Sequence, residues 1–235
     1  MQRWICLLIV IMITGCGRAP VAPAPTAVSQ PTTVLLADLA PLPTGPQTVT
    51  ATLITMSAGA ALAATVVRSD AGIVPLEPQQ VIWLGPVDLP PNLTDNPLAA
   101  QVVQAAGIVE GPGSFGPDGA YRYQMRDPTL RPLPLRTIDM ALLVQNSALY
   151  HEQAIQLRGE LLLSASSAIL SERSGPGGVP AEDTRQIKLA AFAANPVLAE
   201  QLRSGSGEDV RYGTVEITGI WRDNRLYPLI IVLPS

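Results

Sequence analysis

Two pairs of segments in this 235-residue chain match each other, and this internal repetition constrains the fold more than any other feature of the sequence. Residues 51–62 align with residues 159–170, and both segments are apolar and pass into small residues. Further along, residues 103–109 match residues 215–221. Short apolar segments can match by chance, but matches that recur in the same order favour a duplication. The sequence therefore predicts two copies of one small module.

Shorter matches place further elements of the two copies. They pair Gln80-Val81 with Gln186-Ile187, Asn96-Pro97 with Asn195-Pro196, Gly107 with Gly219, and Tyr121 with Tyr227 as the residues that open the last strands. Because the spacing between matched segments differs from pair to pair, we expect loops of different length between equivalent elements.

The second copy shows its secondary structure most clearly. Apolar residues at helical spacing predict a helix, whereas alternating or short continuous apolar runs predict strands. In chain order we expect a short helix over residues 138–149, strands over 154–163 and 185–192, a helix from Asn195 to Arg203, and strands over 210–222 and 226–233. We interpret this order as that of the OB-fold, a five-stranded barrel with three strands, a helix and two strands, in which one of the first three strands has no separate range of its own here.

The second copy also resembles OB-fold-like modules of exported bacterial proteins, in which a helix and a tyrosine precede a first strand of the pattern Val-x-Val-x-Gly-x-Leu. The corresponding positions here are the expected helix, Tyr150 and residues 155–161, with Gly159 at the glycine. A residue without a Cβ atom lets a barrel strand bend sharply, and Gly107 and Gly219 could serve the same purpose in strand four.

The resemblance covers nearly all of residues 34–235. It implies a mainly β chain with short helices (α+β), built as two tandem OB-fold-like five-stranded barrels. The first copy fits less closely, because Ala51 stands where the glycine is expected and the helix after strand three is short or missing. We expect the modules at residues 34–126 and 138–235, joined by a linker over residues 127–137.

The N-terminus has the layout of a secretory signal peptide. Arg3 precedes an unbroken apolar run over residues 4–13, which is roughly half of the about 20 residues that a membrane-spanning helix needs. The residues Ile13-Thr14-Gly15-Cys16 resemble the lipobox of bacterial lipoproteins. This resemblance implies transfer of a diacylglyceryl group to the sulfur of Cys16, cleavage after Gly15, and acylation of the freed amine. An ordinary secreted protein with a spare thiol is the alternative.

We therefore expect a signal peptide over residues 1–15, and a lipidated Cys16 with a disordered tether rich in Pro and Ala over residues 16–33. Two or three acyl chains, palmitate among them, hold a protein firmly at a membrane. The expected partner is thus the membrane, through the lipid on Cys16, and the expected location is the extracytoplasmic face of the cell membrane. Cys6 lies in the signal peptide, so the mature chain would have no thiol for a disulfide.

Charge makes nucleic acid a poor partner. Residues 34–126 carry three arginines against seven acidic residues, and residues 138–235 carry eight basic against eleven acidic residues. OB-folds that bind nucleic acid use a basic groove with stacked aromatic side chains, and neither is evident in the sequence. We therefore expect that the protein does not bind nucleic acid. The expected partner is an envelope protein or a glycan.

Residues suited to catalysis are scarce. The mature chain would have one histidine, His151, one lysine, Lys188, and no free cysteine. His151 and Glu152 could form an acid–base pair, but neighbours in sequence rarely face each other productively. The adjacent acids Glu182-Asp183 lack the alternating ligand spacing of a calcium loop. We therefore expect no catalytic residue, no metal and no cofactor.

If a ligand binds, the OB-fold holds it with loops at one face of the barrel. In the first copy the expected loops are residues 56–79 and 111–120, with Ser114, Phe115 and Asp118 as candidate contacts; in the second they are residues 164–184 and 223–225, with Glu182 and Asp183. Trp83 and Trp221 lie in segments that read as buried strands, and we expect core packing for both.

The function expected from these features is a non-catalytic binding or scaffold module of the cell envelope. The alternative is a surface enzyme or a substrate-binding component of an uptake system, which would need a large cleft with converging polar groups.

Overall fold

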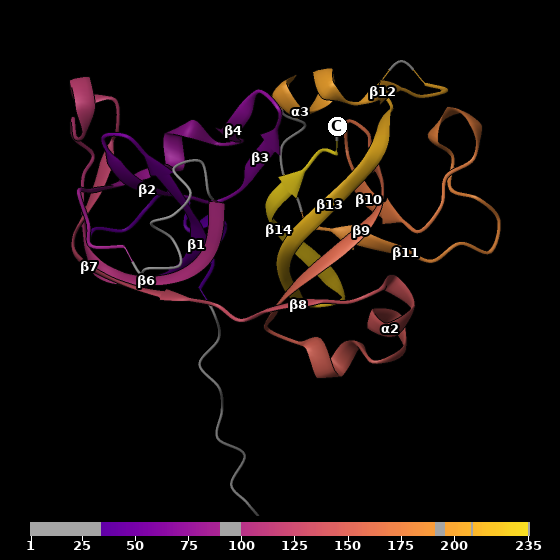
Figure 1. Cartoon of the computed structure of the whole chain (residues 1–235), viewed down its shortest axis with the longest axis horizontal. Coiled ribbons are helices and arrows are strands. Elements are labelled where there is room, and N and C mark those ends of the chain that lie inside the picture. The colour runs from indigo at the N-terminus through magenta and orange to yellow at the C-terminus, as the bar shows by residue number, and fades with distance from the viewer. Residues whose placement is uncertain (1–33, 90–99, 191–195, 208, 235) are drawn as a thin grey trace, which may run out of the picture. The chain divides into compact units, whose positions relative to one another are not determined.

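The first of two closed barrels in the computed structural model is formed by the N-terminal half of the described chain (Figure 1). The structure describes residues 34–89, 100–190, 196–207 and 209–234. The strands of the first barrel are β1 (Gly45–Met56), β2 (Gly59–Ala63), β5 (Ile82–Gly85), β6 (Ala100–Glu110) and β7 (Tyr123–Pro132). They close in the order β1-β2-β5-β7-β6, and β5 pairs with β7 in parallel whereas the other pairs are antiparallel.

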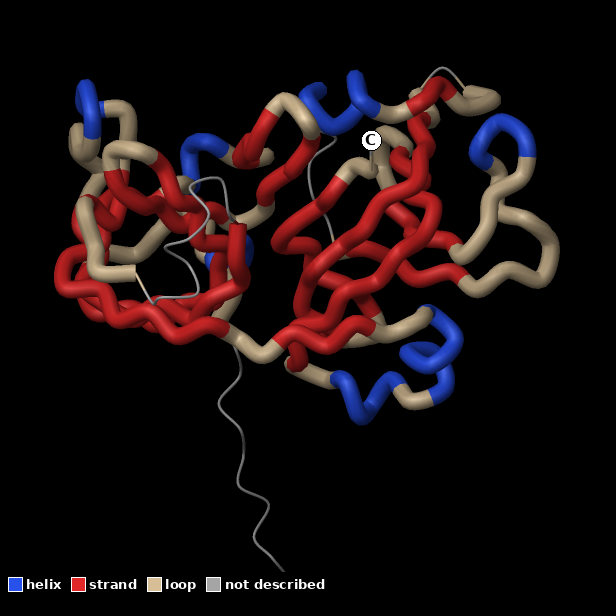
Figure 2. The backbone as a smooth tube through the Cα atoms, viewed as in Figure 1, coloured by secondary structure: helices blue, strands red, loops and turns tan. Residues whose placement is uncertain are grey.

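The second barrel repeats this topology. Its strands are β9 (Gln153–Leu163), β10 (Ala168–Ser171), β11 (Gln186–Leu189), β13 (Arg211–Arg222) and β14 (Arg225–Val232). They run in the order β13-β9-β10-β11-β14, and the pairing of β13 with β14 closes the ring. The third and fifth strands, β11 and β14, again pair in parallel. Strands dominate the described chain (Figure 2), so the predicted fold class, mainly β with two tandem OB-like barrels, is confirmed.

Shorter elements connect the barrel strands. They are β3 (Val66–Ser69), β4 (Gly72–Pro75), β8 (Leu135–Thr137), β12 (Arg203–Ser204), the helices α2 (Met140–Gln145) and α3 (Pro196–Gln201), and the 3₁₀ turns η1 (Leu36–Asp38), η2 (Pro78–Gln80), η3 (Pro117–Gly119), η4 (Ser147–Tyr150) and η5 (Pro176–Gly178). Helix α2 lies inside the range expected for it, and the Asp139 side chain accepts a hydrogen bond from the backbone N–H of Leu142 at its start.

The strand registers confirm the main alignment of the two copies. Ala51 on β1 pairs with Val103 on β6, and Gly159 on β9 pairs with Val215 on β13. These are the residues that the sequence matches to each other. On the other side of the first strands, Leu53 pairs with Leu62, and Leu161 pairs with Leu170, which again preserves the match. The two barrels are therefore equivalent residue by residue in strands one, two and four.

Two of the shorter matches are wrong. Leu62 pairs with Ile82 and the equivalent Leu170 pairs with Ile187, so Ile187 corresponds to Ile82 and not to Val81. A shift of one residue matters because it exchanges the two faces of a strand.

The tyrosine match fails as well. Tyr121 precedes β7 and lies in the loop before it, whereas Tyr227 lies inside β14. The match of Asn96-Pro97, and the expected helix of the first copy, fall outside the described residues.

Glycine has the same role in strand four of both barrels. The ladder shifts its register between Ala106 and Ile108 in the first barrel, and between Thr218 and Gly219 in the second. A Cβ atom on Gly107 would lie 2.6 Å from Met125 Cγ, and one on Gly219 would collide with the carbonyl oxygen of Tyr227. Glycine thus permits a bulge at which neighbouring backbones approach closely, as the sequence suggests.

Each barrel encloses its own apolar core. In the second barrel the core includes Tyr150, which precedes the first strand, and Trp221, whose indole N–H donates to the carbonyl oxygen of Ser147 at 3.1 Å. The first barrel encloses a smaller set centred on Leu53, Leu62 and Ile82. Trp83 is buried as expected, but it belongs to a third cluster outside the barrel interior.

This third cluster lies between the barrels and joins them. It contains Ile54 and Trp83 from the first barrel, and Ile220 and Leu229 from the second. Strand β1 is therefore buried on both faces from Val49 to Thr55. The buried and exposed side chains of such a strand do not alternate as they do in a surface strand. The side chains of one face pack inside the barrel, and those of the other face contact the neighbouring barrel.

Two threonines supply the polar contacts of this interface. The hydroxyl of Thr52 donates to the carbonyl oxygen of Leu229, and that of Thr65 donates to the carbonyl oxygen of Pro228, both at 2.8 Å. Both acceptors lie where β14 shifts its register against β13. Buried carbonyl groups that a ladder leaves unpaired require a partner, and the first barrel provides it.

A hairpin from the first copy extends the sheet of the second barrel. Strands β3 and β4 are inserted between β2 and β5, and β3 pairs in parallel with β14 through Val66 and Ile230. Both barrels accordingly belong to one compact unit.

The segment expected as a linker, residues 127–137, is mostly strand. Strand β7 of the first barrel continues to Pro132, and β8 pairs in parallel with β9 of the second barrel. The expected end of the first module at residue 126 therefore falls in the middle of a barrel strand. The error arises because Asp127 and the prolines of this segment read as loop residues, whereas long-range pairing decides its structure.

An ion-pair network also joins the two copies. Arg222 of β13 binds both carboxylate oxygens of Glu152, at 2.6 and 3.2 Å, and Asp38 of η1 at 3.0 Å. Its guanidinium lies 5.3 Å from the ring centre of Tyr227. Burial alone would lower the pKa of Arg222, but its hydrogen bonds and attraction to Glu152 and Asp38 outweigh this effect and raise it.

Candidate ligand-binding site

Two segments in which we expect ligand contacts come together on the outer surface of the first barrel. The loop over residues 111–122 connects β6 with β7, the fourth and fifth strands, as predicted. Residues 56–79 do not form a single loop, because they contain β2, β3 and β4. Both segments nevertheless contribute walls to one groove.

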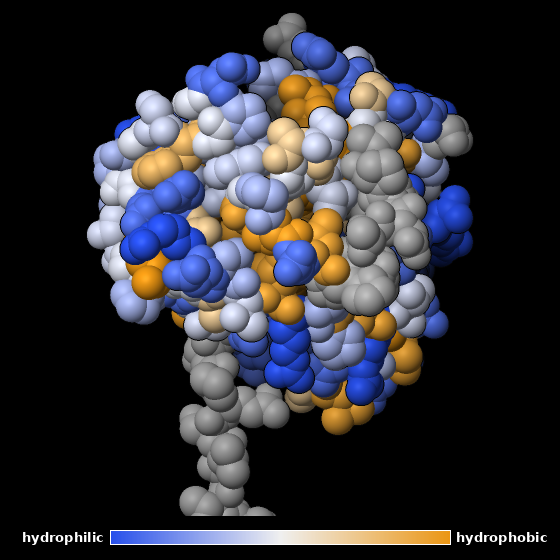
Figure 3. All heavy atoms as spheres, turned by 60° about the vertical axis from the view of Figure 1, so that its left-hand side comes forward, coloured by the Kyte–Doolittle hydropathy of each residue, from blue (hydrophilic) through white to orange (hydrophobic). Residues whose placement is uncertain are grey.

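The groove is lined mainly by apolar side chains and has a volume of about 310 Å³. Its walls come from the end of β1, from β2, from β4 with the following η2 turn, and from the loop before β7. The lining residues that matter below are Ile54, Met56, Ile73, Pro75 and Tyr121. On the face of the molecule that Figure 3 brings forward, apolar residues gather in a patch, with polar residues visible to its left and below it.

Tyr121 is held in place at the wall of the groove. Its ring stacks on Trp83, with centroids 5.0 Å apart and planes inclined by 25°. Its hydroxyl donates to the sulfur of Met56 at 3.5 Å. Burial raises the pKa of this hydroxyl above its ordinary value, because the charged phenolate would lose contact with water. These contacts fix one wall of the groove before any ligand arrives.

The shape of the loop depends on a tight internal pairing. The backbone N–H groups of Phe115 and Tyr121 each donate to the other residue's carbonyl oxygen, at 2.9 and 3.1 Å. Between them Gly116 has φ of +70°, and a Cβ atom there would lie 2.5 Å from the ring of Tyr121. Only glycine allows this close approach, and so the glycine-rich stretch of the sequence shapes the wall of the groove.

The candidate contacts in this loop lie beside the groove. Ser114 and Asp118 are exposed, and neither lines it. Phe115 packs against the cluster between the barrels. Met56 lies within residues 56–79, where ligand contacts are expected, but it is not among the residues predicted to make them. The sequence predicts Tyr121 to open a strand, although an aromatic residue next to a glycine-rich loop is a signal that could have identified it as a wall of the groove.

Within the described residues, the equivalent segments of the second barrel do not meet around a comparable cavity. Residues 164–184 contain β10, and Glu182 and Asp183 are exposed in the connection between β10 and β11. The connection between the fourth and fifth strands is the tight turn at Asp223 and Asn224, both with positive φ. A shallow depression of about 490 Å³ next to this turn is lined by residues of α2, β11 and the turn, and none of residues 164–184 borders it.

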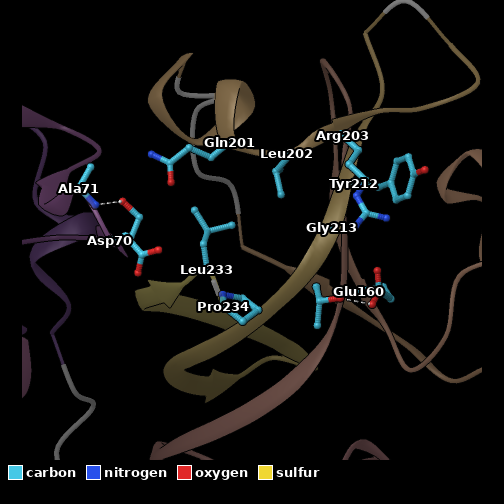
Figure 4. Close-up of a pocket in the computed structure, with 12 residues that line it drawn as sticks. Asp70, Ala71, Glu160, Gln201, Leu202, Arg203, Tyr212, Gly213, Leu233 and Pro234 are labelled. Atoms are coloured by element: carbon cyan, nitrogen blue, oxygen red, sulfur yellow. Dashed lines mark hydrogen bonds between the residues drawn. The ribbon is translucent and has the colours of Figure 1, made fainter.

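A second, polar cleft of about 640 Å³ lies between the β3–β4 hairpin and the outer surface of the second barrel. In Figure 4, Asp70 is on one side of the cleft, and Glu160, Arg203 and Tyr212 are on the other. The Glu160 carboxylate accepts hydrogen bonds from Thr214 at 2.6 Å and from Ser174 at 3.4 Å. These bonds give Glu160 a structural role in the sheet.

The candidate acid–base pair and the candidate metal ligands have the following places in the structure. His151 is exposed, and its neighbour Glu152 is bound to Arg222, so these two residues do not form an acid–base pair. Within the described ranges, no group of three or more His, Cys, Asp or Glu side chains is arranged to hold a metal ion. Cys16, the predicted lipidation site, lies outside the described residues.

Comparison of the chain with protein-family models, with curated proteins and with solved structures gave no match.

Proposed function

We propose that this chain is a lipid-anchored, non-catalytic binding protein of the bacterial cell envelope, and that its first barrel holds the ligand. The observation that carries the proposal is the apolar groove beside Tyr121 and Trp83. Ligand sites are typically concave, mostly apolar and largely preformed. The groove has these properties, and it borders β2 and the loop between strands four and five, where OB-folds hold ligands.

The anchoring part of the proposal depends on the lipobox-like residues that end at Cys16. No helix within the described part of the chain is long and apolar enough to cross a membrane. An acylated Cys16 would hold the barrels at the membrane surface through the proline-rich tether.

Replacement of the cysteine tests the anchor. Cys16→Ser should abolish incorporation of labelled fatty acid and leave an uncleaved or mislocalised precursor, because the sulfur is the acceptor of the diacylglyceryl group. Cys6→Ser is the matched control and should be labelled and cleaved like the wild type. Normal labelling of Cys16→Ser would contradict the proposal.

A pair of equivalent substitutions tests the binding site. The full chain, reconstituted in lipid nanodiscs, is used to capture partners from an envelope extract. Met56→Asp should reduce capture by about tenfold or more, because it places a charge in the apolar groove. Ser164→Asp changes the equivalent residue of the second barrel and should leave capture intact. Equal capture by both variants would exclude the groove as the site.

The polar cleft of Figure 4 supports a second candidate, a substrate-binding component for a small polar ligand, because charged and hydrogen-bonding side chains border a larger volume there. Arg203→Ala would then remove a cationic contact. Loss of capture in Arg203→Ala with full capture in Met56→Asp would favour this candidate over the groove.

A further inference from the structure

Among the described residues, strand β4 provides a free sheet edge next to the groove. In the described residues the extended sheet of the second barrel ends in the order β14-β3-β4, so β4 pairs with β3 on one side only. The unpaired N–H and C=O groups of an edge strand are a template on which another extended chain can pair.

The phase of the β3–β4 ladder determines which groups face this edge. The N–H of Leu76 donates to the carbonyl oxygen of Thr65 at 2.9 Å. Hydrogen-bonded pairs alternate along an antiparallel ladder, so the next such pair joins Val74 to Val67. The backbone groups of Ile73 and Pro75 therefore point away from β3. The free edge presents the N–H and C=O of Ile73 and the C=O of Pro75, since proline has no N–H.

The same two residues connect the edge to the groove. The side chains of Ile73 and Pro75 line it, together with Met56 and Tyr121. Residues that face each other in an antiparallel pair carry their side chains on the same face of the sheet. A residue that exchanges hydrogen bonds with Ile73 would therefore direct its own side chain toward the groove.

We infer that the ligand of the groove is an extended polypeptide segment that adds to β4 as a further strand and inserts an aliphatic side chain opposite Ile73. This inference rests on the proposed function and specifies its ligand. Main-chain hydrogen bonds supply affinity in this mode of recognition, and the pocket for alternate side chains supplies specificity. Residues 34–126 carry three arginines against seven acidic residues, so the segment is neutral or basic around its apolar residue.

A synthetic peptide tests the inference. The probe is a short fluorescent peptide of alternating threonine and isoleucine, blocked at its ends and with a lysine at each end. Its binding to the full chain in lipid nanodiscs is measured by fluorescence anisotropy. Two further peptides are methylated on the backbone nitrogen, one at every isoleucine and one at every threonine. In the proposed pairing the backbone N–H groups of the isoleucines point toward β4, where one isoleucine pairs with Ile73. The backbone N–H groups of the threonines point away from β4.

We expect the parent and the threonine-methylated peptides to bind alike, and methylation at isoleucine to weaken binding by about tenfold or more through loss of the hydrogen bonds to the edge. Met56→Asp should abolish binding of the parent peptide. Equal binding of all three peptides, with Met56→Asp still abolishing it, would overturn strand addition while the groove remained a binding site. Absence of binding by the parent peptide would also overturn the inference, and the capture experiment judges the proposed function separately.

Variants of β4 provide the matching test on the protein. Ile73→Pro removes the outward N–H without removing a hydrogen bond of the β3–β4 ladder, and proline is tolerated at such edge positions. This substitution should weaken binding of the parent peptide by about as much as methylation of the isoleucines does. Val74→Ala changes the opposite face of the same strand and should bind like the wild type. Unchanged binding in Ile73→Pro would contradict pairing at this edge.

Discussion

The two barrels have the same strand order but differ in the connection between their fourth and fifth strands. In the first barrel this connection is the loop over residues 111–122, which brings Tyr121 onto Trp83 and forms a wall of the groove. In the second barrel it is the tight turn at Asp223 and Asn224. A tight turn cannot fold back over the barrel surface, whereas a longer loop can. One topology thus carries a groove beside a long loop in one copy and a tight turn in the other.

The second barrel contributes differently to the whole. Its strand β14 receives the β3–β4 hairpin, and its Arg222 binds Asp38 of the first copy. The outer surface that carries a groove in the first barrel is thereby stabilised from the second. The predictions below test this division of roles, beginning with the largest expected effect.

The bulge glycines should not be equally sensitive to a methyl group. In Gly219→Ala the Cβ atom meets the backbone oxygen of Tyr227 first, whereas in Gly107→Ala it meets the movable Met125 side chain first and lies 2.8 Å from the backbone oxygen of Arg126. We expect Gly219→Ala to lower the free energy of unfolding by about 3 kcal/mol and Gly107→Ala by about 2 kcal/mol, because the backbone contact is less close at Gly107. Urea unfolding followed by circular dichroism measures both. Equal losses would show that the two bulges tolerate side chains alike.

The Arg222 network should contribute more than an ion pair within one barrel. Arg222 is 11 % exposed, and Arg222→Met would leave the carboxylates of Glu152 and Asp38 without their cation. We expect a loss of about 2–3 kcal/mol. Arg185→Met, which removes the more exposed pair with Glu172 in the second barrel, is the matched control and should cost less than about 0.5 kcal/mol. Similar losses in thermal unfolding would contradict a special role for Arg222.

The smallest effect is expected in the titration of Tyr121. Its pKa is raised in the folded state, so the contribution of the neutral phenol to stability is complete below the ordinary tyrosine pKa and is lost as the pH rises through the folded value. Ultraviolet absorbance should show a late phase of tyrosinate formation at alkaline pH. Tyr121→Phe should remove this phase. If the late phase persisted in Tyr121→Phe, it would have to arise from another tyrosine.

The repeat allowed the barrel topology to be predicted because strands one and four carry long, distinctive apolar patterns. Strand three did not reveal its register, since Val81 and Ile82 are both buried and no alternation marks the inward face. The addition of β3 to β14 could not be predicted either. It joins residues far apart in the sequence, and the local pattern of residues 66–75 indicates a hairpin without indicating its partner.

The groove lies next to a loop in which ligand contacts are expected from the sequence, but it is not lined by the residues expected there. OB-fold architecture pointed to the loop before β7, and the groove lies there. The predicted contacts Ser114 and Asp118 lie beside the groove, and its walls are formed by residues such as Met56 and Tyr121 that converge only in the folded chain. Groove walls that depend on tertiary packing leave no local signal in a single sequence.

The central claim, that the first barrel holds the ligand and the second supports it, can be tested in living cells. A photoreactive benzoyl-phenylalanine is incorporated in place of Met56 or of the equivalent Ser164, and the cells are irradiated. We predict covalent adducts to a partner from position 56 and none from position 164, because the groove lies on the first barrel and Met56 lines it. Adducts from position 164 alone, or equal yields from both positions, would contradict the division of roles between the barrels.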